Sequence, residues 1–176
     1  MARPEAPDKV GEPEIKGLSV LRMIFLQCSA DPGGPVVRER QVNVAVDAIR
    51  VLLADDHHHI RETVRSLLKD KFEVVAAVEN GQDAVEAARR LQPDALVLDI
   101  SMPLLNGLEV ARRLSDAGST TKIIMLTIHE ETAFVSAALA AGACGYVSKR
   151  MISVDLIPAI RAAAEGRTFI SPSIRV

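Results

Sequence analysis

Short apolar runs alternate with one-sided amphipathic segments from residue 49 onward. The apolar runs are rich in β-branched residues, Leu and Ala, and they span residues 49–54, 73–78, 95–98, 123–126 and 145–147. Runs of this length and composition are typical of strands that are buried on both faces of a parallel sheet. The segments between them repeat apolar residues at helical spacing, first at Ile60, Val64, Leu67 and Leu68. The pattern therefore predicts alternating strands and helices.

The same helical spacing recurs after each of the later runs. The apolar positions are Ala84, Val85, Ala88 and Leu91, then Val110, Ala111 and Leu114, then Phe134, Val135, Ala138 and Ala141, and finally Val154, Ile157, Ile160 and Ala164. Because β–α–β connections are right-handed, helices in such a chain cover both faces of one sheet. The predicted fold class is α/β, a (βα)5 doubly wound parallel five-stranded sheet.

Residues 1–47 differ from the rest of the chain in composition and in hydrophobic pattern. They are rich in Pro, Gly and charged residues and show no sustained period of 2 or 3.6. We expect a poorly ordered N-terminal extension, although a start codon chosen too far upstream would give the same stretch. The predicted organisation is an extension over 1–47, a folded domain over 48–172 and a C-terminal tail over 173–176.

Four of the predicted strands lead directly into polar residues. The first leads into Asp55 and Asp56, the third into Asp99, the fourth into Thr127, and the fifth is followed closely by Lys149. In open α/β sheets the carboxyl ends of the strands form the ligand site, so we expect these side chains at one edge. Three carboxylates there would repel, since two unit charges about 4 Å apart cost about 4 kcal/mol at an effective dielectric of about 20. Mg2+, together with the Lys149 ammonium, would relieve this repulsion.

This set of residues also suits phosphoryl chemistry. A carboxylate can attack a phosphoryl group while a metal ion and an ammonium neutralise the transferred oxygens. The hydroxyl of Thr127 is placed to hydrogen-bond the product. Taken singly, Asp55 could be a turn or cap residue and Thr127 a strand former, but the ordered set favours a site.

Four segments carry a family resemblance: ADDH at 54–57, VLDISMPLLNGLE at 97–109, MLT at 125–127 and AGACGYVSK at 141–149. In this order and spacing they resemble the receiver domain of two-component response regulators, a flavodoxin-like fold. The forms DDH, D-x-S-M-P and the terminal F-I-S-P-S resemble the NarL/FixJ group in particular.

The resemblance implies a role for each of these positions. Asp99 would accept phosphate from a sensor histidine kinase, and Lys149 would contact the phosphoryl group. Asp55 and Asp56 would hold Mg2+ together with Asp99 and the backbone carbonyl of Ser101.

Thr127 and Tyr146 would form a switch pair that changes a dimer or partner surface on phosphorylation. The alternative for Tyr146 is a plain packing aromatic. His129 stands two positions after Thr127, where it either modulates water access to the site or is solvated. Apart from self-phosphorylation and autodephosphorylation, no enzyme activity is implied.

The chain departs from the family pattern in two places. Arg150 stands where many receivers have Pro, so a cis peptide there is not expected. The NarL/FixJ group normally continues into a helix-turn-helix domain, whereas this sequence stops at Val176. The alternatives are a stand-alone receiver and a fragment of a DNA-binding regulator.

Two other classes of function compete with a phosphorylation switch. One is a receiver-like dimerisation module without phosphotransfer, against which the intact acidic set and Lys149 argue. The other is a phosphatase of the haloacid-dehalogenase type, which would need a second Asp where Ser101 stands. We further predict that His57, His58 and His59 are loop and helix-start residues, and that Asn106-Gly107 forms a tight turn with positive φ.

The charge balance, the N-terminal apolar run and the cysteines limit which partners and which compartment we expect for this chain. With 21 Lys+Arg against 23 Asp+Glu the formal charge is −2, so we expect no nucleic acid binding by this chain alone. The apolar run at 18–28 is interrupted by Arg22 and is shorter than the roughly 20 residues of a membrane span. Cys28 and Cys144 form no C-x-x-C pair, which indicates a reducing, cytoplasmic location.

Overall fold

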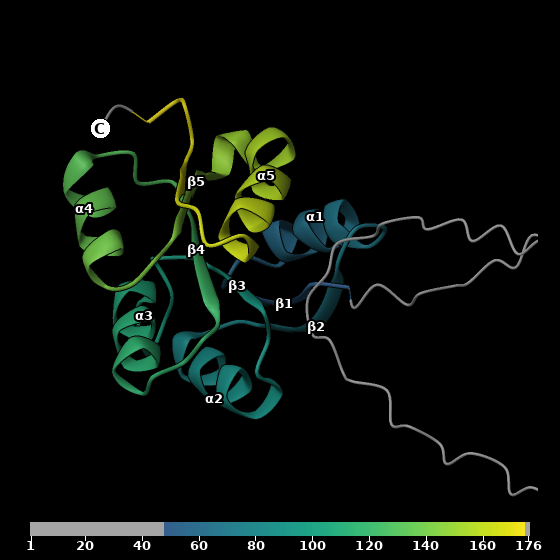
Figure 1. Ribbon diagram of the computed structural model, residues 1–176, viewed down its shortest axis with the longest axis vertical. Coiled ribbons are helices and arrows are strands. Elements are labelled where there is room, and N and C mark those ends of the chain that lie inside the picture. The colour runs from purple at the N-terminus through teal and green to yellow at the C-terminus, as the bar shows by residue number, and fades with distance from the viewer. Residues whose placement is uncertain (1–47, 175–176) are drawn as a thin grey trace, which may run out of the picture. The chain divides into compact units, whose positions relative to one another are not determined.

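Strands and helices alternate along the chain as the hydrophobic pattern predicts (Figure 1). The structure, a computed structural model, describes residues 48–174, so the predictions for residues 1–47, including Cys28 and the 18–28 run, lie outside it. The elements are β1 (Arg50–Ala54), α1 (His58–Leu68), β2 (Glu73–Val78), α2 (Gly81–Leu91), β3 (Ala95–Leu98), α3 (Gly107–Asp116), β4 (Lys122–Thr127), α4 (Thr132–Ala140), β5 (Gly145–Ser148), the 3-10 turn η1 (Lys149–Met151), α5 (Ile152–Ala164) and β6 (Phe169–Ile170).

All strands lie parallel in one sheet with the order β2-β1-β3-β4-β5-β6. The chain passes from β1 to β2 on one side and then crosses back to β3 on the other. The winding therefore reverses between β1 and β3, which is the switch point where open α/β sheets bind ligands. The predicted doubly wound fold is confirmed.

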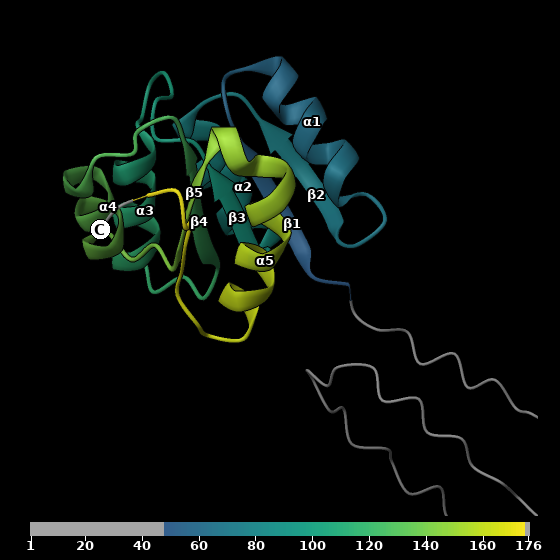
Figure 2. The same cartoon turned by 90° about the horizontal axis from the view of Figure 1, so that it is seen from above.

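Helices cover both faces of this sheet (Figures 1 and 2). Side chains of each strand alternate between the two faces, so that Leu52 and Ala54 of β1 belong to the apolar layer that includes residues of α2, α3 and α4, while Val51 and Leu53 belong to the layer that includes residues of α1 and α5. Strands β1 and β3 are buried along nearly their whole length. Two apolar layers thus hold the carboxyl ends of the central strands in fixed positions.

The sheet has one strand more than the five that were predicted. Phe169 and Ile170 pair with Gly145 and Tyr146 of β5. Two residues are too few to show a strand alternation, which explains why the sequence pattern did not reveal β6. The following segment also packs on the domain, because Ile174, inside the predicted tail, is only 5% exposed.

A buried hydrogen-bond chain ties this last segment to the domain. Ser171 Oγ donates to Asp155 Oδ2 of α5 at 2.6 Å and accepts from Ser148 N at 3.2 Å.

Within residues 48–174, no helix is long and apolar enough to cross a membrane.

Candidate functional site

The residues that follow the central strands meet at one edge of the sheet, as predicted. Strands β1, β3 and β4 run in register, with Ala54 beside Leu98 and Leu98 beside Met125. Parallel strands that end at the same level place their next residues side by side. The residues at this edge are Asp55 and Asp56 after β1, Asp99 after β3, Thr127 at the end of β4 and Lys149 after β5.

Lys149 links two buried carboxylates. Its Nζ lies 2.7 Å from Asp99 Oδ2, to which it donates a hydrogen bond, and 2.8 Å from Asp55 Oδ2. The side chains of Asp55 and Asp99 are 1% and 2% exposed. A charged group removed from water in this way is stable only when an opposite charge lies close by.

Burial acts on the pKa of both Asp55 and Lys149, but with different net results. Burial raises the pKa of Asp55, although Lys149 and the hydrogen bond from the His57 backbone act in the opposite direction. Burial also acts to lower the pKa of Lys149, but its contacts with Asp55 and Asp99 outweigh this and the pKa is raised. Lys149 is therefore held firmly in its protonated form.

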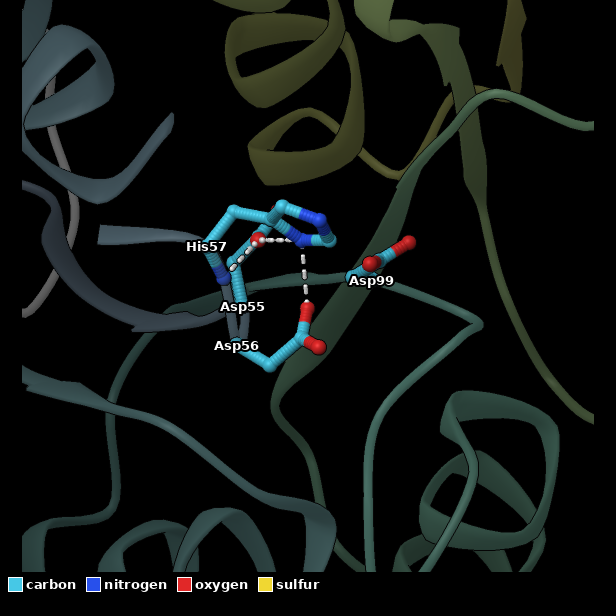
Figure 3. A group of neighbouring side chains, drawn as sticks. All are labelled: Asp55, Asp56, His57 and Asp99. Atoms are coloured by element: carbon cyan, nitrogen blue, oxygen red, sulfur yellow. Dashed lines mark hydrogen bonds and ion pairs between the residues drawn. The ribbon is translucent and has the colours of Figure 1, made fainter. Parts of the chain in front are cut away.

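Asp56 and His57 form the outer part of the site (Figure 3). His57 Nδ1 lies 2.6 Å from Asp56 Oδ1 and 3.5 Å from Asp55 Oδ1, and its backbone N–H donates to Asp55 Oδ1 at 2.9 Å. His57 is the N-cap residue of α1, which agrees with its predicted place at a helix start. Its contact with the carboxylates was not predicted. The available signal was its position directly after two aspartates.

The residues present fit a hard divalent cation. One ligand atom each from Asp55, Asp56, His57 and Asp99 lie within 4.8 Å of one another. Asp55 Oδ2 is the buried side-chain atom in the described part of the chain that lacks a conventional hydrogen bond, and it lies 2.8 Å from Lys149 Nζ as an ion pair. Carboxylate oxygens are the ligands that Mg2+ prefers.

The predicted switch residues both bind the backbone of His129. Thr127 Oγ1 accepts from His129 N at 3.2 Å, and Tyr146 donates from its hydroxyl to His129 O at 2.8 Å. Thr127 and Tyr146 are fully buried. Burial, and then the nearby charges of Glu131 and Glu130, raise the pKa of Tyr146. The Tyr146 ring lies inside the domain in this structure, where its hydroxyl bonds to the His129 carbonyl.

The His129 side chain spans two loops at the carboxyl edge. Its Nε2 lies 3.0 Å from Ser101 Oγ, which belongs to the β3–α3 loop, and its ring stacks on Phe134 with centroids 4.3 Å apart. Its side chain is 28% exposed, so it is neither fully solvated nor buried. The predicted role of the Ser101 carbonyl as a metal ligand stays a prediction.

The prediction for Asn106-Gly107 is wrong in its reason. Asn106 is extended (φ −72°) and caps α3, where its side chain accepts from Glu109 N at 2.9 Å. The positive φ of this loop occurs at Leu104 instead, with a value of 66°. Gly107 is needed because a Cβ there would lie 2.1 Å from the carbonyl oxygen of Asp99. Helix α3 thus packs directly against the backbone of the acidic site.

A doubly wound parallel sheet with buried aspartates and a lysine at its carboxyl edge defines a receiver-type signalling domain. The chain belongs to the response regulator receiver domain family, whose model matches residues 51–161. This confirms the resemblance that the four motifs carry.

The relatives agree with this family. The chain is 38% identical over 128 residues to the transcriptional regulatory protein DegU of Brevibacillus brevis and to the response regulator UvrY of Escherichia coli K12. These matches cover 72% of this chain but only 54% and 59% of the two relatives. The chain therefore spans little more than half the length of these relatives.

Solved structures show the same domain. The signal receiver domain of a putative response regulator NarL from Mycobacterium tuberculosis matches with a TM-score of 0.67 and 31% identity, covering 69% of this chain and 99% of that one. A LuxR-family two-component response regulator from Aurantimonas matches with a TM-score of 0.68 and 35% identity, covering 71% and 91%.

Proposed function

We propose that this domain is a Mg2+-dependent phosphoacceptor of a two-component system and that Asp99 is the residue phosphorylated. The observation that carries the proposal is the buried Asp99 carboxylate, which receives a hydrogen bond from Lys149 beside the carboxylates of Asp55 and Asp56. A structural ion pair alone would need one carboxylate, whereas Lys149 contacts those of Asp55 and Asp99 and the carboxylate of Asp56 lies beside them.

The proposed reaction is a transfer from a phosphohistidine of a sensor kinase. An oxygen of Asp99 attacks phosphorus, the phosphorus–nitrogen bond breaks, and the imidazole leaves as a neutral ring when its other nitrogen carries the proton. Lys149 neutralises charge on the phosphoryl oxygens. Asp55, Asp56, Asp99 and the Ser101 carbonyl would hold Mg2+, which would supply further positive charge near those oxygens. Water later cleaves the acyl phosphate, so the result is a timed switch rather than turnover of a substrate.

The proposed output is a change of protein surface. A phosphoryl group adds negative charge and acceptor oxygens beside Thr127, whose hydroxyl would leave His129 to reach them. The loop between β4 and α4 would follow, and with it a surface for a second copy of the chain or another protein. Such a pathway belongs in the cytoplasm, where kinase and acceptor meet.

The test is phosphorylation with a small phosphodonor and Mg2+, followed by intact mass. Wild type is expected to gain one phosphoryl group and Asp99→Asn none. Asp56→Asn is expected to weaken Mg2+ binding without unfolding the domain, since it removes a ligand but also relieves repulsion. Asp116→Asn, on the exposed end of α3, is the matched control. Full labelling of Asp99→Asn would move the acceptor elsewhere, and the absence of labelling in wild type would favour a dimerisation module.

A second candidate is the regulatory part of a DNA-binding transcription regulator. It is favoured by the partial coverage of DegU, a transcriptional regulatory protein by name. DNA contacts would then be made by parts of the regulator that the match to DegU does not cover. We expect no sequence-specific DNA binding by the chain alone at physiological salt, and nanomolar binding to a defined site would contradict this.

A further inference from the structure

Arg61 is a buried cation on the inner face of α1. Its side chain is 9% exposed, and it stands on the same face of the helix as Val64 and Leu68, both of which are completely buried. An arginine in such a position is costly unless its donors are satisfied. Its partners therefore indicate what it does.

The guanidinium of Arg61 bridges the ends of two strands. One terminal nitrogen donates to the backbone carbonyl of Asp55 at 2.8 Å. The other pairs with Glu79, which follows β2. The carbonyl of Asp55 belongs to the peptide that joins Asp55 to Asp56, and Asp55 N is already fixed by Val78 O at 3.2 Å. Arg61 therefore fixes the peptide plane from which both carboxylates project.

We propose that Arg61 is a positioning residue of the metal site, which holds the Asp55–Asp56 peptide so that both carboxylates face the same cation. The inference rests on the proposed function, because it assigns the orientation of two Mg2+ ligands to a side chain that touches neither carboxylate. Mutation of a residue that orients metal ligands without touching the metal commonly lowers metal affinity 10- to 100-fold.

Charge and geometry make opposite predictions for the loss of Arg61. Removing a cation near three carboxylates would by itself tighten the binding of Mg2+. Freeing the Asp55–Asp56 peptide would weaken it. Because Glu79 already balances the guanidinium charge, geometry dominates, and we expect Arg61→Gln to bind Mg2+ about tenfold more weakly than wild type.

The experiment is a Mg2+ titration of the whole chain by calorimetry, with unfolding measured in parallel. Four variants separate the effects. Arg61→Gln is expected to lose about tenfold in affinity. Arg61→Lys keeps the charge but cannot hold both partners, so it is expected to lose less. Glu79→Gln keeps the bond to Asp55, and since the Glu79 side chain is 70% exposed, the loss of its screened charge should change the affinity far less than Arg61→Gln does. Val64→Ala, one turn further along α1, should lower the unfolding midpoint and leave the affinity unchanged.

Equal or tighter Mg2+ binding by Arg61→Gln would overturn the proposal, as would a loss of affinity in Val64→Ala that matches it. If Arg61→Gln does not fold, Arg61→Lys decides the matter, because any loss of affinity at constant charge is geometric and wild-type affinity contradicts the proposal. Failure of the proposed function looks different: wild type itself would then neither bind Mg2+ nor be phosphorylated.

Discussion

The hydroxyl of Tyr146 donates a 2.8 Å hydrogen bond to the backbone carbonyl of His129. The backbone N–H of His129 donates a second hydrogen bond, to Thr127 Oγ1 at 3.2 Å. The two predicted switch residues are therefore coupled through one residue of the β4–α4 loop rather than by contact with each other. A movement of Thr127 toward Asp99 removes one of the bonds that fix this loop, and its consequences can be measured.

Binding of the phosphoryl mimic beryllofluoride is expected to speed amide hydrogen exchange at His129, because Thr127 then leaves its N–H. The change should extend to the loop around residues 128–131 and be accompanied by a shift toward a dimer in sedimentation. A differential stabilisation of about 1.4 kcal/mol would shift such an equilibrium tenfold. Thr127→Ala should show fast exchange at His129 with and without the mimic. An identical response of wild type and Thr127→Ala would rule out this coupling.

Stability is expected to fall as the pH rises above about 10, the ordinary pKa of tyrosine. The pKa of Tyr146 is raised in the folded state, so the native protein keeps a proton that the unfolded chain releases. Each such group lowers the free energy of unfolding by up to about 1.4 kcal/mol per pH unit in that range. Lys149 acts in the same direction, because its pKa is also raised.

Tyr146→Phe tests this contribution directly. It should flatten the alkaline fall in stability while costing about 1 kcal/mol at neutral pH for the lost hydrogen bond. The chain has one tyrosine and no tryptophan, so phenolate absorbance reports on this residue alone. Ionisation of the phenol well before unfolding would contradict the assignment.

Lys149→Met is expected to destabilise the domain by about 3–5 kcal/mol in the absence of divalent metal, because two buried carboxylates lose their partner. Mg2+ should restore more stability to this variant than it adds to wild type. Urea unfolding with and without Mg2+ measures both effects. Arg150→Met is the control. The Arg150 side chain is 81% exposed and its ion pair with Glu130 is long, at 3.7 Å, so its loss should change the free energy of unfolding by no more than about 0.5 kcal/mol. Equal losses in the two variants would show that Lys149 is not buried between charges.

Gly107→Ala separates propensity from packing. Helix propensity alone would favour Ala by about 1 kcal/mol. The new Cβ would lie 2.1 Å from the carbonyl oxygen of Asp99, so we expect a loss of about 2 kcal/mol or more and slower phosphorylation. Gly118→Ala meets no atom within 4 Å and costs only the strain of φ +69°, about 1 kcal/mol. Denaturant unfolding should show a larger loss of stability for Gly107→Ala than for Gly118→Ala. A gain of stability in Gly107→Ala would refute the close approach of α3 to Asp99.

The sequence alone was sufficient to place the acidic site at one edge. Strand periodicity located β1, β3, β4 and β5, and parallel strands that end together bring the residues after them together whatever lies between. This is why Asp55, Asp99, Thr127 and Lys149 could be predicted to converge without any coordinates.

Closer detail depended on packing between segments that are distant in the sequence. Asn106-Gly107 has the composition of a turn, yet the glycine serves the approach of α3 to Asp99, a contact that no local pattern encodes. The sequence does show Arg61 as a charged residue on an apolar helix face. It does not show which group Arg61 binds, because the acceptor at Asp55 is a backbone carbonyl and every residue carries a backbone carbonyl.

The sequence by itself determined the order of strands and helices, the doubly wound α/β fold and the set of residues at the carboxyl edge, because these follow from the periods of hydrophobic residues and the handedness of their connections. Only the tertiary structure decided that Lys149 lies between two carboxylates, that His57 contacts Asp56 and that Tyr146 is already buried against His129. These contacts depend on the directions of side chains, and those directions are set when the layers pack.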